Sequence, residues 1–464
     1  MSGLAVVILA AGQGTRMLSQ QPKVLHALAG IPLLAHVVRA AMGLRPERLV
    51  VVVGFGAGAI QEAIGKVLPN AGITWVTQEE RLGTAHAVGC ALPALSGFHG
   101  DVLILNGDHP LIRTPILEAF VAAHRDEGWA VTLLSTTPAT AAGYGRVVRR
   151  AGGRLERVVE EKDATPAERD LVEVSTGTYC LAADRLPGWI ARVGNANAQG
   201  EYYLPDVVAL AVADGVGAGA FHHPEAASLV GVNNRRHLAQ LEGLLRDRLV
   251  GEWMDRGVTF VDPSSCWVAA DVELGADTVI FPHVILGPGV VVGRDCEIGP
   301  FCQVVRSRLA ERVRVLSFCH LEGAEIAADC VVGPYSRLRP GTELASKARI
   351  GNFCETKKAR IGVGSKVNHL SYIGDAEVGA GVNIGAGTIT CNYDGVLKHK
   401  TVLGDGVFVG SDTHFVAPIT VGDRAVVGAG TTVTEDIPAD ALAVARAPQR
   451  NIPNWTARRP KRSK

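Results

Sequence analysis

The sequence lacks the features that mark several protein classes. Its 46 Lys and Arg residues balance 46 Asp and Glu residues, so no overall charge favours binding to nucleic acid or to a membrane surface. Nine cysteines are scattered without a Cys-x-x-Cys pair, which argues against a disulfide framework and a zinc site. No apolar run approaches the roughly 20 residues of a membrane helix. These absences predict a soluble, cytoplasmic protein with small-molecule partners.

The chain ends show no targeting signal. The apolar stretch 4–11 has no basic segment before it, and a glycine-rich segment follows it, so we interpret it as a buried strand and not as a signal peptide. Basic residues gather only at the other end, in 458–464, where a solvated, disordered tail is the expectation.

The first part of the chain, residues 1–235, alternates apolar runs with helical patterns. Leu4–Leu9, Leu49–Val53 and Val102–Leu105 are continuous apolar runs, and helical patterns such as Leu33–Met42 separate them. This alternation is typical of an α/β domain with a mostly parallel, Rossmann-like sheet and helices on both faces. With 464 residues and 47% hydrophobic residues, the chain has room for at least one further domain with its own core.

Residues 236–256 have the pattern of a single amphipathic helix. Apolar residues recur there at intervals of three or four, with Arg, Glu and Asp between them. They are Leu238, Leu241, Leu245, Leu249 and Trp253. We interpret this segment as a linker helix between two domains.

The remaining residues, 257–464, follow a six-residue repeat. An aliphatic or aromatic residue recurs at every sixth position, most regularly in the series Leu403, Val409, Phe415, Val421, Val427 and Val433. Glycine often comes next, as in Ile298-Gly299, where the backbone must turn sharply. A period of six indicates a parallel β-helix. The series slips at 305–325, 351–360 and 391–401, which we interpret as inserted residues that form loops on one face.

The first strand leads into a candidate phosphate-binding loop, Leu9-Ala10-Ala11-Gly12-Gln13-Gly14-Thr15-Arg16. Its backbone N–H groups can hold phosphate oxygens, and Arg16 adds positive charge. On its own, the loop is equally compatible with a structural turn. Asp108, after Asn106-Gly107 at the end of a predicted strand, is a candidate Mg²⁺ ligand because parallel sheets bind ligands at that edge. The alternative for Asp108 is a residue of a tight turn.

Together these motifs resemble a known enzyme family. The loop followed by Pro22-Lys23 is similar to the sugar nucleotidyltransferases. The segments 143–147, 160–163 and 231–234 extend the resemblance to the N-acetylglucosamine-1-phosphate uridyltransferases. The resemblance implies that Arg16 and Lys23 neutralise the triphosphate of UTP. Asp108 and Asn233 would bind Mg²⁺. The nucleotide and sugar site would comprise Leu9, Ala10, Ala11, Gly12, Lys23, Gln78, Gly83, Thr84, Asn106, Gly107, Asp108, Gly145, Glu160, Ser175 and Asn233.

Within that set, the resemblance implies that Gln78 and Gly83-Thr84 read the uracil ring, although Gly83-Thr84 also has the pattern of a helix N-cap. Three positions depart from the family's usual pattern. Gln13 replaces a common Lys or Arg and removes one charge from the phosphate site. Asn106 stands where Tyr is common. Ser175 replaces an Asn that usually contacts the sugar, and it is expected to reach the sugar through water.

The repeat region contains a second candidate site. Arg337 and Arg339, with Lys357 and Lys358, place cations along the coil where they could hold a sugar phosphate. His369 is a candidate general base, because an imidazole titrates near neutrality. A single His on a solenoid is more commonly an ordinary surface residue.

Residues 337–447 resemble the acetyltransferase half of the same bifunctional family, whose β-helix is left-handed. The resemblance implies that Arg339 and Lys357 bind the substrate phosphate, that His369 is the base, and that Tyr372 and Asn383 contact the sugar. Acetyl-CoA would meet Ala386, Asn392, Tyr393, Ser411, Ala429 and Arg446. Members are homotrimers with this site between adjacent β-helices.

The sequence therefore predicts a bifunctional enzyme. Its C-terminal half would acetylate glucosamine-1-phosphate with acetyl-CoA, and its N-terminal half would join the product, N-acetylglucosamine-1-phosphate, to UMP from UTP. Phosphoryl transfer of this kind relies on positioning and charge neutralisation. Two alternatives are a nucleotidyltransferase whose β-helix only regulates or oligomerises it, and a non-enzymatic trimeric scaffold.

Overall fold

The structure, a computed structural model, describes residues 3–458 and consists of two compact units that divide between Leu245 and Arg246. The basic tail expected at 458–464 lies outside the described residues, except for Arg458. Within the described part, no helix has the length and apolar character needed to cross a membrane.

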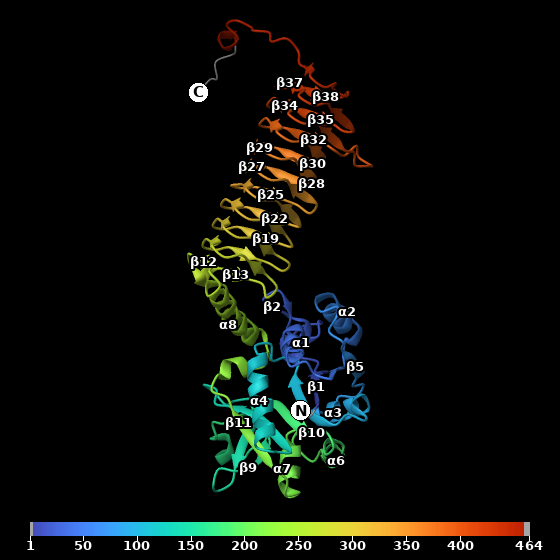
Figure 1. The fold of residues 1–464 in the computed structure, drawn as a ribbon, viewed down its shortest axis with the longest axis vertical. Coiled ribbons are helices and arrows are strands. Elements are labelled where there is room, and N and C mark those ends of the chain that lie inside the picture. The colour runs from blue at the N-terminus through green and yellow to red at the C-terminus, as the bar shows by residue number, and fades with distance from the viewer. Residues whose placement is uncertain (1–2, 459–464) are drawn as a thin grey trace. The chain divides into compact units, whose positions relative to one another are not determined.

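The first unit contains a nine-stranded sheet with the strand order β11-β7-β10-β6-β1-β4-β5 along its main path (Figure 1). The strands are β1 Gly3–Ala10, β4 Arg48–Val53, β5 Thr74–Thr77, β6 Gly100–Asn106, β7 Val131–Thr136, β8 Arg146–Arg149, β9 Leu155–Val159, β10 Val174–Ala182 and β11 Ala218–His222. Neighbours along the path run parallel, except that β10 lies antiparallel between β6 and β7. The predicted α/β class with a mostly parallel sheet is confirmed, with β10 and the attached β8–β9 hairpin making it mixed.

Seven helices accompany this sheet, together with a short hairpin of β2 Ala27–Leu28 and β3 Ile31–Pro32. The helices are α1 Leu33–Gly43, α2 Ala57–Val67, α3 Thr84–Ala91, α4 Thr114–Asp126, α5 Pro166–Arg169, α6 Leu186–Ile190 and α7 Asp206–Ala213. Val7 of β1 packs in one core with Val88 of α3 and Trp189 of α6, and the neighbouring Ile8 is fully buried as well. Because β1 is buried on both faces, its sequence is a continuous apolar run.

The carboxyl ends of β1, β4 and β6 meet at one edge of the sheet. Leu9 of β1 pairs with Val52 of β4 on one side and with Asn106 of β6 on the other. The glycine-rich loop follows β1, and Gly107-Asp108 follows β6, so both segments leave the sheet at this edge. The register of the sheet thus brings the first set of candidate residues together.

Helix α8, Arg235–Met254, is the helix predicted over 236–256, and the boundary between the units falls within it. In its first half, Glu242 accepts a hydrogen bond from the backbone N–H of Ala29 in the first unit. In its second half, Val250 belongs to the apolar core of the second unit. The segment predicted as a separate linker is therefore shared between the two units.

The second unit is a parallel β-helix, visible in Figure 1 as strands stacked coil upon coil. One face is an eleven-stranded sheet of β12 Thr259–Phe260, β15 Val279–Ile280, β18 Glu297–Ile298, β21 Arg314–Val315, β24 Val331–Val332, β27 Arg349–Asn352, β29 Lys366–His369, β31 Asn383–Ile384, β34 Phe408–Val409, β37 Val426–Val427 and β39 Leu442–Ala443.

The other strands form a seventeen-stranded sheet. They are β13 Trp267–Val268, β14 Glu273–Leu274, β16 Ile285–Leu286, β17 Val291–Val292, β19 Gln303–Val305, β20 Arg308–Leu309, β22 His320–Glu322, β23 Ala324–Ile326, β25 Arg337–Leu338, β26 Thr342–Leu344, β28 Glu355–Ile361, β30 Tyr372–Val378, β32 Ile389–Cys391, β33 Thr401–Leu403, β35 His414–Val416, β36 Ile419–Val421 and β38 Thr432–Val433. Residues in register on successive coils pair in parallel, as Ile298 does with Val315.

The six-residue repeat forms the core of this coil. Ile298, Val332, Val367 and Val427 each have 0% exposure and belong to one continuous apolar core. Glycine at a corner allows two coils to approach closely, since a Cβ on Gly351 would lie 1.9 Å from the carbonyl oxygen of Asn368 in the next coil. The predicted β-helix of hexapeptide repeats is confirmed.

The interpretation of the three slips was correct for one and wrong for two. Residues 392–399 do form an inserted loop between β32 and β33. At 305–325 and 351–360, however, a corner is one residue shorter. The buried Leu309, for example, follows the buried Val304 after about five positions and not after the usual six. The backbone at this corner has positive φ, as at Arg306 (φ 45°) and Lys358 (φ 44°), and so does the backbone at six-residue corners such as Phe301 (φ 59°).

Candidate active sites

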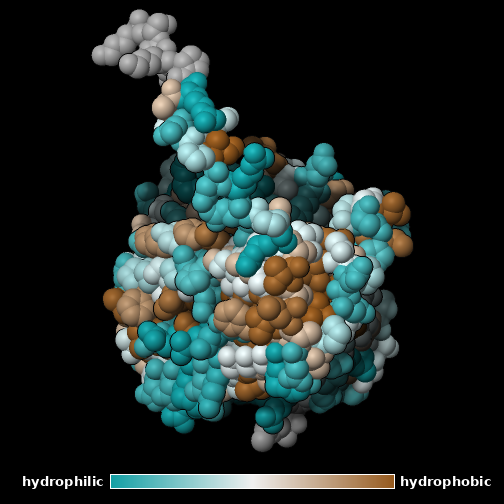
Figure 2. Space-filling view, turned by 90° about the horizontal axis from the view of Figure 1, so that it is seen from above, coloured by the Kyte–Doolittle hydropathy of each residue, from teal (hydrophilic) through white to brown (hydrophobic). Residues whose placement is uncertain are grey.

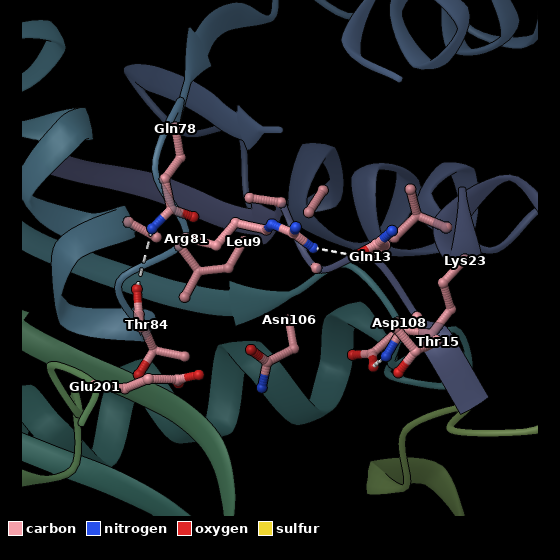
Figure 3. Close-up of a pocket in the computed structure, with 17 residues that line it drawn as sticks. Leu9, Gln13, Thr15, Lys23, Gln78, Arg81, Thr84, Asn106, Asp108 and Glu201 are labelled. Carbon is pink, nitrogen blue, oxygen red and sulfur yellow. Dashed lines mark hydrogen bonds and ion pairs between the residues drawn. The ribbon is translucent and has the colours of Figure 1, made fainter. Parts of the chain in front are cut away.

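A cavity of about 540 Å³, here called the first cavity, opens at the carboxyl edge of the sheet in the first unit (Figure 3). Figure 3 shows Gln78 and Thr84 at one end, Lys23 and Asp108 at the other, and Asn106 between them. Ten predicted site residues line it, namely Leu9, Ala10, Ala11, Gly12, Lys23, Gln78, Gly83, Thr84, Asn106 and Asp108. Gly107 instead packs beside β1, where its backbone N–H donates to the Leu9 carbonyl at 2.9 Å.

The glycine-rich loop is shaped by its contact with Lys23. Gly14 has a φ of 67°, and a Cβ at this position would lie 2.5 Å from the Cβ of Lys23. Glycine is therefore required both for the left-handed backbone and for the close approach. The same contact holds the stem of Lys23 against the loop while its ammonium group reaches Asp108.

Lys23 and Asp108 form an ion pair at the polar end of the cavity. Burial alone would raise the pKa of the Asp108 carboxyl, but the charges of Lys23 and the neighbouring His109 outweigh burial, and the pKa lies below its usual value. Burial, together with Lys23, also lowers the pKa of His109. Asp108 is therefore an anionic oxygen donor at neutral pH.

The opposite end of the cavity is formed by Gln78 and the start of α3. The amide nitrogen of Gln78, a buried residue, donates to the Gly83 carbonyl at 3.2 Å. Gly83, with a φ of 110°, is the N-cap residue of α3, so the N-cap interpretation of Gly83-Thr84 is correct, and both residues also line the cavity. Thr84 accepts a hydrogen bond from the backbone N–H of Leu204 at 2.9 Å.

A second cavity of about 270 Å³ adjoins the first and shares Leu9, Thr84, Asn106 and Asp108 with it. Its lining also contains the predicted residues Arg16, Gly145, Glu160, Ser175 and Asn233. Burial is the main cause that raises the pKa of Glu160, with the carboxylates of Asp163 and Asp206 adding to it. The two cavities together could hold a nucleotide next to a sugar phosphate.

Arg16 and Asn233, far apart in the sequence, meet here, and the Arg16 guanidinium donates to Asn233 Oδ1 at 2.9 Å. Asp108 and Asn233 thus offer one carboxylate and one amide oxygen to the same cavity, each already bonded to a cationic side chain. Hard Mg²⁺ prefers such oxygen donors and completes its shell with phosphate and water, so the pair fits the predicted metal. No cluster of three His, Cys, Asp or Glu suited to a metal occurs in residues 3–458.

The three departures from the family pattern each have a partner in the structure. Gln13 Oε1 accepts a hydrogen bond from the Arg81 guanidinium. Arg81 thus places a positive charge beside position 13, where the family commonly has Lys or Arg. Asn106 donates to the Thr176 carbonyl at 3.3 Å. Ser175 Oγ lies 3.1 Å from the hydroxyl of Tyr179, and both residues line the second cavity.

Arg81, Tyr179 and Tyr144 were not predicted from the sequence, although all three line a cavity. Arg81 lies two residues before the recognised Gly83, and Tyr144 lies inside the recognised segment 143–147, so proximity to a motif was an available signal. Tyr179 lies on β10 among apolar residues, and its pattern does not distinguish it from the core.

In the second unit, a group of cations lies on the surface of the coil near β28. Arg339 pairs with Glu355 at 2.8 Å, and the nearby Lys357 interacts with Lys398 of the inserted loop. The close approach of the Lys398 ammonium is the largest cause that lowers the pKa of Lys357, and the charge of Arg339 acts in the same direction. Mutual repulsion among three cations favours the binding of an anion such as a phosphate. Lys398 was not predicted.

His369, which ends β29, is exposed and interacts through one ring nitrogen with the preceding coil. Its Nδ1 lies 3.1 Å from Oδ1 of Asn352. An amide oxygen can only accept, so this contact requires a proton on Nδ1 and leaves the lone pair on Nε2. His369 is thereby oriented as a proton acceptor, and Asn352 is a further residue that the sequence analysis missed.

Three of the six predicted acetyl-CoA residues occupy the same corner as His369 on successive coils. The backbone N–H of Gly387, next to Ala386, donates to the His369 carbonyl, and that of Asp412, next to Ser411, donates to the Ala386 carbonyl at 2.7 Å. Arg446 reaches the Ala429 carbonyl with its guanidinium. His369, Ala386, Ser411 and Ala429 therefore form one column along the outside of the coil.

The remaining predicted residues lie away from this column. Asn392 donates to Asp375, while Tyr393 lies on the inserted loop, 59% exposed, with its hydroxyl bonded to the Gly395 carbonyl. Tyr372 in β30 pairs in register with Glu355 and Ile389, and Asn383 in β31 pairs with Lys366 and Phe408. Within the described residues no hydrogen bond or ion pair links Tyr393 or Asn383 to His369. Tyr372 follows His369 by three residues, and Asn383 lies on β31, which pairs with the His369 strand β29.

Comparisons with known proteins match both units. The MobA-like NTP transferase domain family matches residues 6–183, and the bacterial transferase hexapeptide family matches residues 271–306 and 400–435. Proteins described as bifunctional protein GlmU align along nearly the whole chain. The protein of Trichlorobacter lovleyi is 47% identical over 451 residues, covering 97% of each chain. That of Alkalilimnicola ehrlichii is 49% identical over 457 residues, covering 98% of this chain and 96% of the relative. That of Pelobacter propionicus is 46% identical over 464 residues, covering both chains fully.

Proposed function

This chain belongs to the family of bifunctional GlmU proteins, and we propose that each of its two reactions uses the site residues of one compact unit. The protein is a transferase that makes UDP-N-acetylglucosamine, a precursor of the bacterial cell wall. It acetylates glucosamine-1-phosphate and transfers UMP from UTP to the product. The meeting of Gln78, Lys23 and Asp108 in one cavity is the observation that carries the assignment of the uridylyl site.

In the first unit, the two adjoining cavities take the two substrates of uridylyl transfer. The first cavity binds UTP, with the uracil ring at Gln78 and the triphosphate at Lys23 and Arg16. The second cavity binds the sugar phosphate near Glu160 and Gly145. A phosphate oxygen of N-acetylglucosamine-1-phosphate then attacks the α-phosphorus of UTP, and pyrophosphate leaves. Lys23 and Arg16 stabilise the negative charge that develops on the phosphates.

Asp108 and Asn233 would hold Mg²⁺ through their side-chain oxygens. When bound, the ion neutralises charge on the phosphates. Lys23 and Arg16, which contact these oxygens in the structure, are then free to turn toward the phosphates. The low pKa of Asp108 keeps its carboxylate charged for this role across the neutral range.

In the second unit, the cations Arg339, Lys357 and Lys398 bind the phosphate of glucosamine-1-phosphate. The lone pair on His369 Nε2 takes the proton from the amine as that amine attacks the thioester carbonyl of acetyl-CoA. The nitrogen–acyl bond forms, the carbon–sulfur bond breaks, and the thiol of coenzyme A leaves. Ala386, Ser411, Ala429 and Arg446 form the track for coenzyme A along the coil.

We also propose that the protein works as a homotrimer in the cytoplasm. The inserted loop carries large exposed apolar side chains, with Val396 82% and Leu397 62% exposed. Figure 2 shows brown apolar groups among teal polar ones on the surface seen from above. Exposed apolar surface of this kind favours association. The loop of one copy, with Tyr393, would complete the His369 site of the next.

The assignments can be tested with purified protein, glucosamine-1-phosphate, acetyl-CoA, UTP and Mg²⁺, with free thiol and pyrophosphate followed separately. The wild type is expected to release both. His369→Ala is expected to release neither until N-acetylglucosamine-1-phosphate is added, and pyrophosphate alone afterwards. If the wild type releases pyrophosphate only from the acetylated sugar, the His369 site is wrong and the β-helix is a regulatory or oligomerising module.

A further inference from the structure

His86 of α3 lies directly behind the residue assigned to the uracil ring. Its Nδ1 is 2.9 Å from the amide nitrogen of Gln78, and the same nitrogen donates to the Gly83 carbonyl at 3.2 Å. The two acceptors thus share the two N–H groups of one amide. Gln78 is 4% exposed, and the part of it that remains accessible lines the first cavity.

The Gly83 carbonyl settles which end of the amide faces α3. A carbonyl oxygen only accepts hydrogen bonds, so the amide group beside it must be the –NH₂. The nearby Nδ1 of His86 must then also accept, which requires a neutral ring with its proton on Nε2. No hydrogen bond to the other end of the amide, Gln78 Oε1, occurs among the described residues, and Figure 3 shows this oxygen turned away from the hydrogen-bonded nitrogen.

We propose that His86 is a positioning residue that sets base selectivity by fixing the orientation of the Gln78 amide. The inference rests on the proposed role of Gln78 in binding the base. A fixed Oε1 accepts the N3–H of a uracil ring. Cytosine presents a bare N3 acceptor at the same place, and two acceptors facing one another leave both groups unpaired. Such a mismatch is a strong source of discrimination.

His86 lies outside the first cavity. His86 lies one helical turn before Cys90 on α3, and both line a separate cavity of about 430 Å³ together with Leu82, Ile190 and Tyr202. This cavity shares no lining residue with the first cavity, which His86 does not line, so His86 acts on the base only through Gln78. A substitution at His86 therefore changes base selectivity without removing a substrate contact.

The test measures kcat/KM for UTP and for CTP with N-acetylglucosamine-1-phosphate. His86→Leu removes the acceptor. The ratio of kcat/KM for UTP to that for CTP is then expected to fall about three- to tenfold, the effect of losing one hydrogen bond. His86→Asn places an amide oxygen near the former Nδ1 and is expected to restore the preference to within about twofold of the wild type. Cys90→Ala, on the same helix and cavity, is the matched control and is expected to leave the ratio unchanged.

Two further results separate this inference from the proposed function. Gln78→Leu is expected to lose the UTP preference regardless of residue 86. If Gln78→Leu keeps the preference, the proposed role of Gln78 is wrong. If Gln78→Leu loses it while His86→Leu keeps it, only the inference about His86 is overturned. The same conclusion follows if His86→Asn and His86→Leu reduce the preference equally, since a merely structural loss would do that.

Discussion

The two units build their candidate sites in opposite ways. In the first unit, loops spread between residues 9 and 233 fold into adjoining cavities, and burial together with neighbouring charges shifts the pKa of Asp108 and Glu160. In the second unit, His369 and Arg446 lie exposed on the outside of a coil whose interior is filled with aliphatic side chains. The site in the first unit is a pair of cavities, and the site in the second unit is a set of exposed side chains on the surface of the β-helix.

This difference shows what each fold can supply by itself. A cavity excludes water, which strengthens the interactions of Lys23, Asp108 and Arg16 with a bound phosphate. His369 and Arg446 lie exposed on the outside of the β-helix, so a second surface against them would be needed to exclude water from bound substrates. We therefore expect the uridylyl site to be complete in one chain and the acetyl site to need two.

The largest expected effect separates the two reactions at His369. His369→Ala should lower acetyl transfer by about 100- to 10,000-fold, because general-base catalysis is lost. Uridylyl transfer should stay at the wild-type rate. Thiol release and pyrophosphate release, measured with the substrates of each reaction alone, check this. His320→Ala, at another position of the β-helix, is the control. An equal loss of acetyl transfer in that variant would mean that the effect of His369→Ala is structural.

The reciprocal change is Asp108→Asn, which keeps the size of the side chain and removes its charge. Uridylyl transfer should fall by about 100- to 1,000-fold, because the anchor for Lys23 and for Mg²⁺ is weakened. Acetyl transfer should not change. Asp184→Asn, on the surface of the same unit, serves as the control. Nearly normal pyrophosphate release by Asp108→Asn at saturating Mg²⁺ would exclude the proposed metal site.

Stability should also divide between the units. Ile298 is fully buried in the coil, and Ile298→Ala should destabilise the second unit by about 2–5 kcal/mol through lost contacts and the cavity left behind. Calorimetry should show the transition of the second unit moved to lower temperature, with uridylyl transfer retained just above that transition. Val261→Ala, at a position 54% exposed, should change stability by less than about 0.5 kcal/mol. A shared transition for both units would contradict their independence.

A smaller effect concerns the cation group on the coil. Lys398→Ala should raise KM for glucosamine-1-phosphate about 10- to 150-fold, since one charged hydrogen bond to phosphate is lost. Lys398 lowers the pKa of Lys357. As pH rises, Lys357 of the wild type should therefore lose its charge, and the protein its affinity for phosphate, at a lower pH than a lysine without a neighbouring cation would. In Lys398→Ala that loss should move to higher pH. A pH profile of KM that does not move would show that the two lysines act independently.

The sequence was informative where a pattern repeats or a motif is compact. The six-residue period located the buried Ile298 and Val427, and the glycine-rich motif located the loop in which Gly14 must be glycine. Less was predictable where a contact depends on the fold. Arg81 and Lys398 come from loops without a repeat, and only the folded chain brings them to Gln13 and Lys357.

The errors have the same origin. A slip in a repeat can come from an added or a missing residue, and the sequence alone did not distinguish the short corners at Arg306 and Lys358 from insertions. The helix over 236–256 was predictable from its apolar stripe. Its division between two units was not, because it depends on which half packs on which core, as Glu242 and Val250 show.

The contrast between a site within one chain and a site between chains can be measured by complementation. His369→Ala would be co-expressed with Asn392→Ala/Tyr393→Ala, each inactive in acetyl transfer alone. In a mixed cyclic trimer about a quarter of the interfaces would pair an intact His369 with an intact loop, so about a quarter of the acetyl transfer should return. Co-expression of Lys23→Ala with Asp108→Asn should return no uridylyl transfer. Recovery in neither mixture would place the whole acetyl site in one chain and contradict the account.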